Sequence, residues 1–153
     1  MSQESPSKPG PVQPVQAQTG LVTLLFTDVV GSVALKQQIG DLGGARLIQA
    51  HHLLVRTTLA EVGCGKEIET AGDSFLIMFH TPSEAVKFAL RFQGRLRELN
   101  REQAVPLLDR LGLHLGEVVI REPVEGMKPR ELYGSNVDIC ARVMSLAKGG
   151  QGQ

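Results

Sequence analysis

The stretch Leu21–Ser32, LVTLLFTDVVGS, is an apolar run that ends in a single acid, Asp28, followed by a glycine. Its first part, Leu21–Thr27, is short, apolar and partly β-branched, which predicts a buried β-strand. Gly31 then marks the turn into a helical region. This stretch therefore predicts a lone carboxylate at the end of a buried strand.

A second stretch, Glu69–Phe79, reads ETAGDSFLIMF and supplies another acid next to a glycine. Two strands are expected here, Lys66–Ala71 and Ser74–Phe79. The tight turn between them contains Asp73 and is typical of a β-hairpin.

The other expected elements complete an order of β-α-β-β-α-β-α. Helical spacing of apolar residues follows Gly31 and stops at the glycines around Cys64. This order predicts an α+β fold, a ferredoxin-like βαββαβ sandwich. The later elements are a helix that starts at Pro82, a strand at Arg110–Ile120, a loop at Arg121–Arg130 and a helix at Gly134–Lys148.

Composition fits one domain and argues against several partner classes. The chain has 153 residues, with sixteen acidic and sixteen basic side chains, so no net charge attracts nucleic acid or anionic lipid. Aromatic residues make up only 4%, which removes the stacking surfaces of single-strand binders. Apolar runs are too short to span a membrane.

The two ends differ from the middle of the chain. Residues 1–19 are rich in Pro, Ser and Gln and are expected to be a disordered tail, which leaves residues 20–153 as the folded domain. The GGQGQ sequence at Gly149–Gln153 ends abruptly, and we expect that the chain is cut inside its domain.

Cys64 and Cys140 are far apart and have no zinc-ligand spacing around them. Two reduced thiols in a cytoplasmic protein are the simplest interpretation, and a disulfide is the alternative.

The four histidines show no metal-binding spacing. We expect His51 and His52 to serve surface or interface packing on their helix. His80 and His114 are expected in a loop and a strand, without an obvious partner.

Asp28 and Asp73 are expected to converge at one edge of the sheet, since the first strand of this topology neighbours the hairpin strands. Two hard oxygen ligands suit Mg²⁺ or Mn²⁺. The alternative is that Asp28 caps a helix and Asp73 is only a turn residue. The residues directly after Asp28 complete the site, with Val29 assigned to the metal ions and Val30, Gly31 and Ser32 to phosphate through helix-start amides.

Four motifs, FTDVVGS, ETAGD, LGLHLGEV and YGSNVDICARVMSLA, together resemble the class III nucleotidyl cyclase domain over about Leu21–Gln151. The resemblance implies a homodimer with two sites at its interface. Asp28 and Asp73 would hold two Mg²⁺ or Mn²⁺ ions per site, and a purine nucleoside triphosphate would become its 3′,5′-cyclic monophosphate and pyrophosphate. Signalling by a cytoplasmic protein with a further regulatory domain is also implied.

Family members carry an Asn-x-x-x-Arg pair on the last helix, and these positions are Asp138 and Arg142 here. Arg142 matches, and its family role is to stabilise charge on the phosphate in the transition state. Asp138 departs from the asparagine that orients the ribose. The alternative is a simple i,i+4 ion pair between the two side chains.

The resemblance also implies base selection by Glu69 and Glu131. Glu69 stands where adenylate cyclases have lysine and resembles guanylate cyclases, because a carboxylate accepts from guanine N1–H and N2–H. Glu131 instead resembles the adenylate-type aspartate. The alternative for Glu69 is a solvent-facing strand residue.

Two other functions remain open from the sequence. The departures at Glu69 and Asp138 fit a degenerate cyclase homology domain that binds nucleotide or a partner without turnover. A polymerase-palm relative that makes a cyclic dinucleotide would be expected to have a GGDEF-like turn, and this turn is TAGDS.

Members of the class III cyclase family also carry a phosphate-binding lysine beyond the point where this chain ends.

Overall fold

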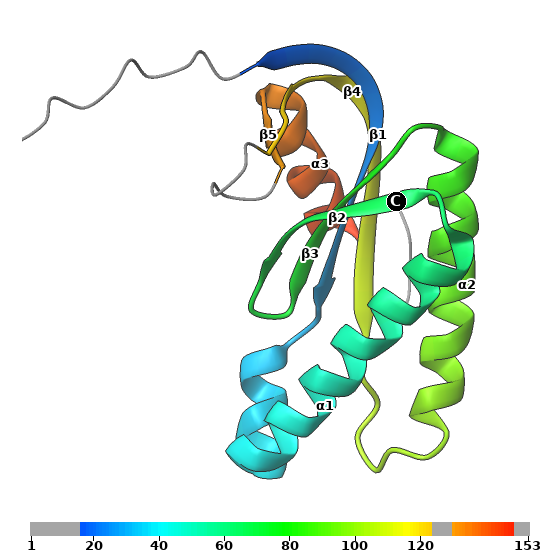
Figure 1. The fold of residues 1–153 in the computed structure, drawn as a ribbon. Coiled ribbons are helices and arrows are strands. Elements are labelled where there is room, and N and C mark those ends of the chain that lie inside the picture. The colour runs from blue at the N-terminus through cyan, green and yellow to red at the C-terminus, as the bar shows by residue number, and fades with distance from the viewer. Residues whose placement is uncertain (1–15, 124–129, 149–153) are drawn as a thin grey trace, which may run out of the picture.

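The structure is a computed structural model that describes residues 16–123 and 130–148. Its sheet has the strand order β2-β3-β1-β4-β5, and every neighbouring pair is antiparallel (Figure 1). This order confirms the predicted α+β, ferredoxin-like arrangement. The strands are β1 (Ala17–Val29), β2 (Gly65–Ala71), β3 (Ser74–Phe79), β4 (Asp109–Arg121) and β5 (Glu131–Tyr133); the helices are α1 (Ser32–Val62), α2 (Pro82–Asn100) and α3 (Ser135–Leu146).

β1 is longer than expected, and this corrects the boundary of the predicted tail. Its ladder with β4 runs from the pair Ala17–Arg121 to the pair Val29–Asp109. The first residues of β1 were assigned to the tail because they are polar, but main-chain pairing with β4 orders them. Residues 1–15 and 149–153 lie outside the described residues. The short strand β5 was not predicted.

Glycines set the ends and the bend of α1. Gly31 and Gly63 flank the helix with φ of 66° and 74°, values that favour glycine. The Gly63 amide donates to the Leu59 carbonyl at 2.9 Å and closes the last turn. Gly40, with φ of 79° and ψ of 165°, interrupts the helical backbone. Leu35 before this bend and Leu47, Val55 and Leu59 after it are all buried in the core.

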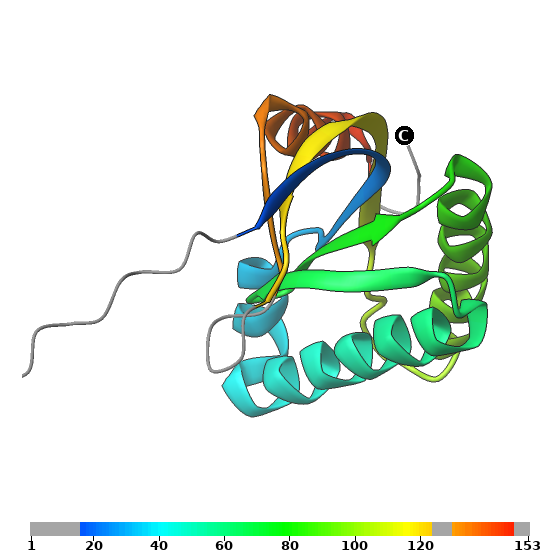
Figure 2. The ribbon, with the colours of Figure 1, turned by 45° about the horizontal axis from the view of Figure 1, so that its top comes forward.

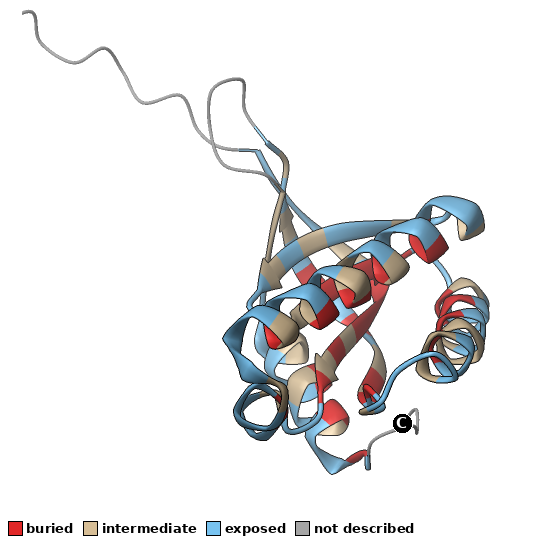
Figure 3. Ribbon diagram, turned by 90° about the horizontal axis from the view of Figure 1, so that it is seen from below, coloured by how far each residue is buried: buried red, intermediate tan, exposed pale blue. Residues whose placement is uncertain are grey.

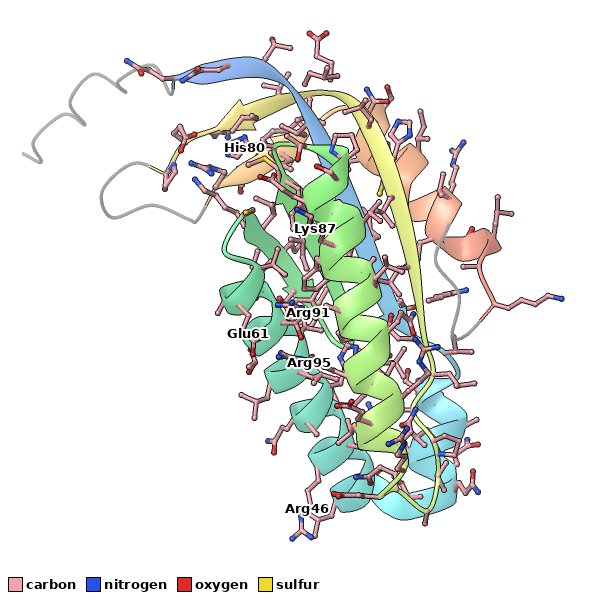
Figure 4. The ribbon with its side chains drawn as sticks, turned by 90° about the vertical axis from the view of Figure 1, so that its right-hand side faces the viewer. Arg46, Glu61, His80, Lys87, Arg91 and Arg95 are labelled. Atoms are coloured by element: carbon pink, nitrogen blue, oxygen red, sulfur yellow. The ribbon has the colours of Figure 1, made fainter. Side chains whose placement is uncertain are left out.

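α2 starts with a complete capping box. The Thr81 hydroxyl accepts from the Glu84 amide, and the Glu84 carboxylate accepts from the Thr81 amide at 3.1 Å. Phe88 and Phe92 are fully buried and belong to the core. On the side of α2 that faces α1, Arg91 and Arg95 point toward Glu61, which pairs with both (Figure 4).

The alternation of strand side chains divides the core into two layers. α1 and α2 cover one face of the sheet, and α3 lies on the other, behind β4 (Figures 1 and 2). Buried residues line the sheet-facing sides of α1 and α2 (Figure 3). Leu25, Phe75 and Leu111 belong to the α1/α2 layer, whereas Leu24 and Leu76 belong to the α3 layer. Side chains that alternate along β1 therefore face different environments.

Both cysteines are free thiols; Cys64 is exposed and Cys140 is buried. Burial raises the pKa of the Cys140 thiol to about 11, so it stays protonated at neutral pH. None of the helices in residues 16–123 and 130–148 has the length and apolar content of a membrane-spanning segment.

Candidate active site

Asp28 lies near the end of β1 on the face of the sheet that α3 partly covers. Its Oδ2 accepts a hydrogen bond from Nη2 of Arg110 at 2.9 Å, and its Oδ1 accepts from the hydroxyl of Ser74 at 3.0 Å. The residue that caps α1 is Gly31, which makes no side-chain cap bond. The alternative of Asp28 as a helix cap is therefore wrong.

Asp73 lies in the turn between β2 and β3, where Gly72 adopts a φ of 60°. Its Oδ2 is buried and has no hydrogen-bond partner among the described residues. Ser74, the next residue, bonds to Asp28 across the β1–β3 pair. The predicted neighbourhood of the two acid-bearing segments is thus confirmed.

The donor set fits a hard divalent cation. A buried carboxylate oxygen without a donor is costly, and a cation would satisfy it. Within the described residues there is no group of three or more histidine, cysteine or acidic side chains that could hold a metal. Two carboxylates agree with Mg²⁺ or Mn²⁺, which leave other positions to water and phosphate oxygens. Val29 can contribute only its main chain, because its side chain is a hydrocarbon without a donor atom and is buried in the core.

The predicted phosphate-binding turn needs one correction. The amide of Val30 donates to the carbonyl of Leu108 at 2.8 Å, so it is not free to bind phosphate. Main-chain N–H groups need an acceptor where water is excluded, and here the adjacent chain supplies it. The amides of Gly31 and Ser32 remain the predicted phosphate donors.

Glu69 and Glu131 line one pocket of about 320 Å³, although they are far apart in the sequence. Glu69 lies on β2, just after an irregularity in its pairing with β3, and Glu131 lies on β5. The apolar part of the lining suits a flat ring, and the acids supply acceptors. The other lining residues are Ile68, Leu76, Arg130, Leu132, Tyr133 and Val137.

Glu131 already has partners within its own chain. The Tyr133 hydroxyl donates to Glu131, and this hydrogen bond, together with burial, raises the pKa of Tyr133. Arg121 lies 3.5 Å from the same carboxylate. Glu69 has no such partner among the described side chains, so it is the more available acceptor in the pocket.

A smaller hollow of about 230 Å³ connects this pocket with the acid end of β1. Glu69 and Leu76 line both spaces, and Ser74, the partner of Asp28, lines the smaller one. The pocket of Glu69 therefore adjoins the contact between Ser74 and Asp28.

Asp138 and Arg142 are exposed on α3 and do not pair with each other, which contradicts the ion-pair alternative. Neither side chain contacts the pocket of its own chain. This placement agrees with a role toward a second protomer, which stays a prediction.

α3 is fixed on β4 by close contacts. Asn136 donates from Nδ2 to the Glu117 carbonyl at 2.8 Å, and its Oδ1 lies 2.8 Å from Nε2 of His114. His114 therefore has a partner, contrary to the prediction. His80 lies in an exposed loop, as predicted.

Sequence reasoning missed a buried polar cluster on the opposite face of the sheet. Asp109 is fully buried and accepts from the Thr27 hydroxyl, and its Oδ2 lies 2.5 Å from Nε2 of His51. Burial raises the pKa of Asp109, although its hydrogen bonds with His51 and Thr27 oppose this shift. The prediction of surface or interface packing for His51 is wrong. The four-residue spacing of Leu47, His51 and Val55 was the available signal.

Comparison with known proteins places these features in a family. Residues 15–153 match the model of the adenylate and guanylate cyclase catalytic domain. A receptor-type adenylate cyclase of Trypanosoma brucei brucei, GRESAG 4.3, is 31% identical over 87% of the chain and 14% of its own length. The adenylate cyclase of Podospora anserina is 30% identical over 90% of the chain and 7% of its own length. The chain thus spans a small part of these relatives.

A solved structure supports the same conclusion. A Trypanosoma brucei adenylate cyclase in its monomeric state aligns with a TM-score of 0.73 and 29% identity, over 87% of this chain and 72% of that one. The chain belongs to the adenylate and guanylate cyclase catalytic domain family.

Proposed function

We propose that this chain is a class III nucleotidyl cyclase domain that converts a purine nucleoside triphosphate to its 3′,5′-cyclic monophosphate and pyrophosphate. One observation carries the proposal. Asp28 near the end of β1 accepts a hydrogen bond from Ser74, which directly follows Asp73, and Asp73 has a buried carboxylate oxygen without a donor among the described residues. Family membership opposes the polymerase-palm alternative.

Asp28 and Asp73 would hold Mg²⁺ or Mn²⁺, two per site, with the main chain of Val29. Bound there, the ions would supply charge neutralisation for the triphosphate and acidify the 3′-hydroxyl. The amides of Gly31 and Ser32 bind phosphate oxygens at the start of α1. The reaction joins the 3′-oxygen to the α-phosphorus and breaks the bond to pyrophosphate.

The base lies in the pocket of Glu69 and Glu131, and both acids are hydrogen-bond acceptors there. Arg142 acts from a second protomer, where a permanent cation stabilises charge on the phosphate. Asp138 approaches the ribose, and as a carboxylate it accepts a hydrogen bond from a hydroxyl. The domain works as a homodimer in cytoplasmic signalling, next to a regulatory domain.

A domain without turnover is the second candidate, and the bond between Asp28 and Arg110 favours it. A guanidinium that already occupies Oδ2 of Asp28 competes with a metal ion for that oxygen. Such a domain would still bind nucleotide or a partner.

The test is product formation by the chain with ATP or GTP and Mn²⁺, followed by chromatography of cyclic nucleotides. Asp28→Ala is expected to abolish turnover and to leave dimerisation intact. Asp41→Ala, an exposed acid on α1, is the matched control and should retain turnover. Unchanged turnover in Asp28→Ala would rule out the metal assignment, and no product from either nucleotide would favour the second candidate.

A further inference from the structure

Two consecutive histidines on α1 reach the two segments that carry the paired acids. Nε2 of His51 lies 2.5 Å from Asp109, and Asp109 also accepts from Thr27, the residue before Asp28. Nε2 of His52 lies 2.8 Å from the carbonyl of Gly72, the residue before Asp73. His51 is thus linked through Asp109 to the residue that precedes Asp28, and His52 bonds directly to the residue that precedes Asp73.

The His51 contact is enclosed by the core. His51 and Asp109 are fully buried, and the ring of His51 lies 5.7 Å from the ring of Phe92 and 6.0 Å from that of Phe75. Polar groups are costly in such a place unless they bond to one another. Surrounded by apolar side chains, these hydrogen bonds are stronger and better defined than they would be in water.

This buried cluster also restrains the residues next to it in β1 and β4, whose side chains lie on the opposite face of the sheet. Thr27 and Asp109 point toward α1, so the next residues, Asp28 and Arg110, point toward the α3 face. Because Asp28 and Arg110 are directly paired in the β1–β4 register, holding Thr27 and Asp109 together holds this pair as well.

The His52 contact fixes the hairpin turn. Gly72 adopts a φ of 60°, and its carbonyl is exposed at the turn, where the N–H of His52 donates to it. The ring of His52 packs edge-on against Phe75, 5.0 Å between centroids, which limits its rotation. Burial lowers the pKa of His52, so the neutral ring with one N–H is favoured.

We propose that His51 and His52 are positioning residues that set the separation of Asp28 and Asp73, and so the affinity of this site for a divalent cation. This inference rests on the proposed function for the choice of Asp28 and Asp73 as ligands. Neither histidine touches the nucleotide or the cation. Their common neighbour is Phe75, which lies between the two contacts.

The test measures Mn²⁺ binding without nucleotide, by the electron paramagnetic resonance signal of free Mn²⁺. His52→Leu removes the donor to Gly72 and is expected to weaken Mn²⁺ binding about fivefold, the change that one hydrogen bond of ordinary strength represents. His52→Gln retains an N–H at similar reach and should bind within about twofold of wild type. Leu53→Ala, an exposed neighbour, is the control for changes in α1.

A second pair of variants tests the buried contact without replacing His51, whose loss could unfold the domain. Thr27→Val keeps the shape but removes the hydroxyl, and it should weaken Mn²⁺ binding by a similar factor, whereas Thr27→Ser should restore it. Thermal unfolding without metal checks that all variants are folded.

The possible failures can be told apart. No cyclic product from a wild-type chain that binds Mn²⁺ overturns the proposed function. Mn²⁺ affinities of His52→Leu and Thr27→Val equal to that of wild type overturn the positioning role. An equal loss of affinity in His52→Leu and His52→Gln also overturns it, since the hydrogen bond would then be irrelevant.

Discussion

Arg110 faces Asp28 across the β1–β4 ladder and donates to its Oδ2 at 2.9 Å. The side chain of Asp28 is 18% exposed, so the pair is partly shielded from water. The same carboxylate is a predicted metal ligand, so the guanidinium and a divalent cation compete for one oxygen.

Arg110→Met is therefore expected to tighten Mn²⁺ binding. A partly exposed ion pair contributes about 0.2–1 kcal/mol, which corresponds to a decrease of about 1.4- to fivefold in the dissociation constant when the competitor is removed. Titration with Mn²⁺ measures this change. Arg56→Met, which breaks the pair with Glu67 at the other surface of the sheet, should leave the affinity unchanged. Weaker binding by Arg110→Met would show that Arg110 supports the site instead of competing for it.

Gly112→Ala is expected to destabilise the domain by separating α3 from β4. A Cβ at this position would lie 2.3 Å from the amide nitrogen of Met144 and 2.5 Å from its Cα, both main-chain atoms of α3. Overpacking of this kind costs about 1–3 kcal/mol in the free energy of unfolding. Urea denaturation measures the loss.

Gly94→Ala is the matched control, because a Cβ there meets nothing within 4 Å. Gly94 lies inside α2, so alanine should raise the free energy of unfolding by about 0.5–1 kcal/mol. Equal stability of the two variants would contradict the assigned contact between α3 and β4.

The sequence predicted most elements because their signals are local. The apolar run before Asp28 and the glycine-containing hairpin turn each specify one element, and Pro82 with Ser83 and Glu84 specifies the start of α2. The antiparallel order of these elements then brings Asp28 next to Ser74. The residues at the ends of the central strands were predictable for that reason.

The polar cluster of His51, Asp109 and Thr27 was not predictable by the same means. Asp109 begins a strand, where a charged residue normally signals a loop, and only the three-dimensional pairing with Val29 places it in the core. For His51, the choice between two adjacent histidines depends on a rotation of about 100° around the helix axis. Gly40 breaks the helix before these residues, so the face set by residues 32–39 does not predict which histidine faces the core.

Glu69→Lys is expected to lower the ratio of kcat/KM for GTP to that for ATP by about tenfold or more. A carboxylate accepts from guanine N1–H and N2–H, whereas an ammonium group has only donors. The loss of one such hydrogen bond in a pocket amounts to about 1–3 kcal/mol. Steady-state kinetics with both nucleotides measures the ratio. Glu67→Lys, two residues earlier on β2 and paired with Arg56, is the control, and an equal effect there would contradict base recognition by Glu69.

Asp109 is expected to make the stability of the domain depend on pH with a sign opposite to that of an ordinary paired acid. Burial raises the pKa of Asp109 above its usual value of 3.8, so the folded protein binds this proton more tightly than the unfolded chain. Its contribution to stability is therefore complete below pH about 4 and is lost as the pH rises through the pKa of the folded state. Asp109→Asn should show no such loss, so the difference in unfolding free energy between wild type and variant should fall from pH 4 toward pH 7.

Glu61→Gln provides the contrast, since the hydrogen bond from Arg95 lowers the pKa of Glu61 and its contribution to stability is lost as the pH falls. Urea denaturation at each pH measures both differences, and a wild-type advantage that grows with pH would show that Asp109 is stabilised as the anion by His51.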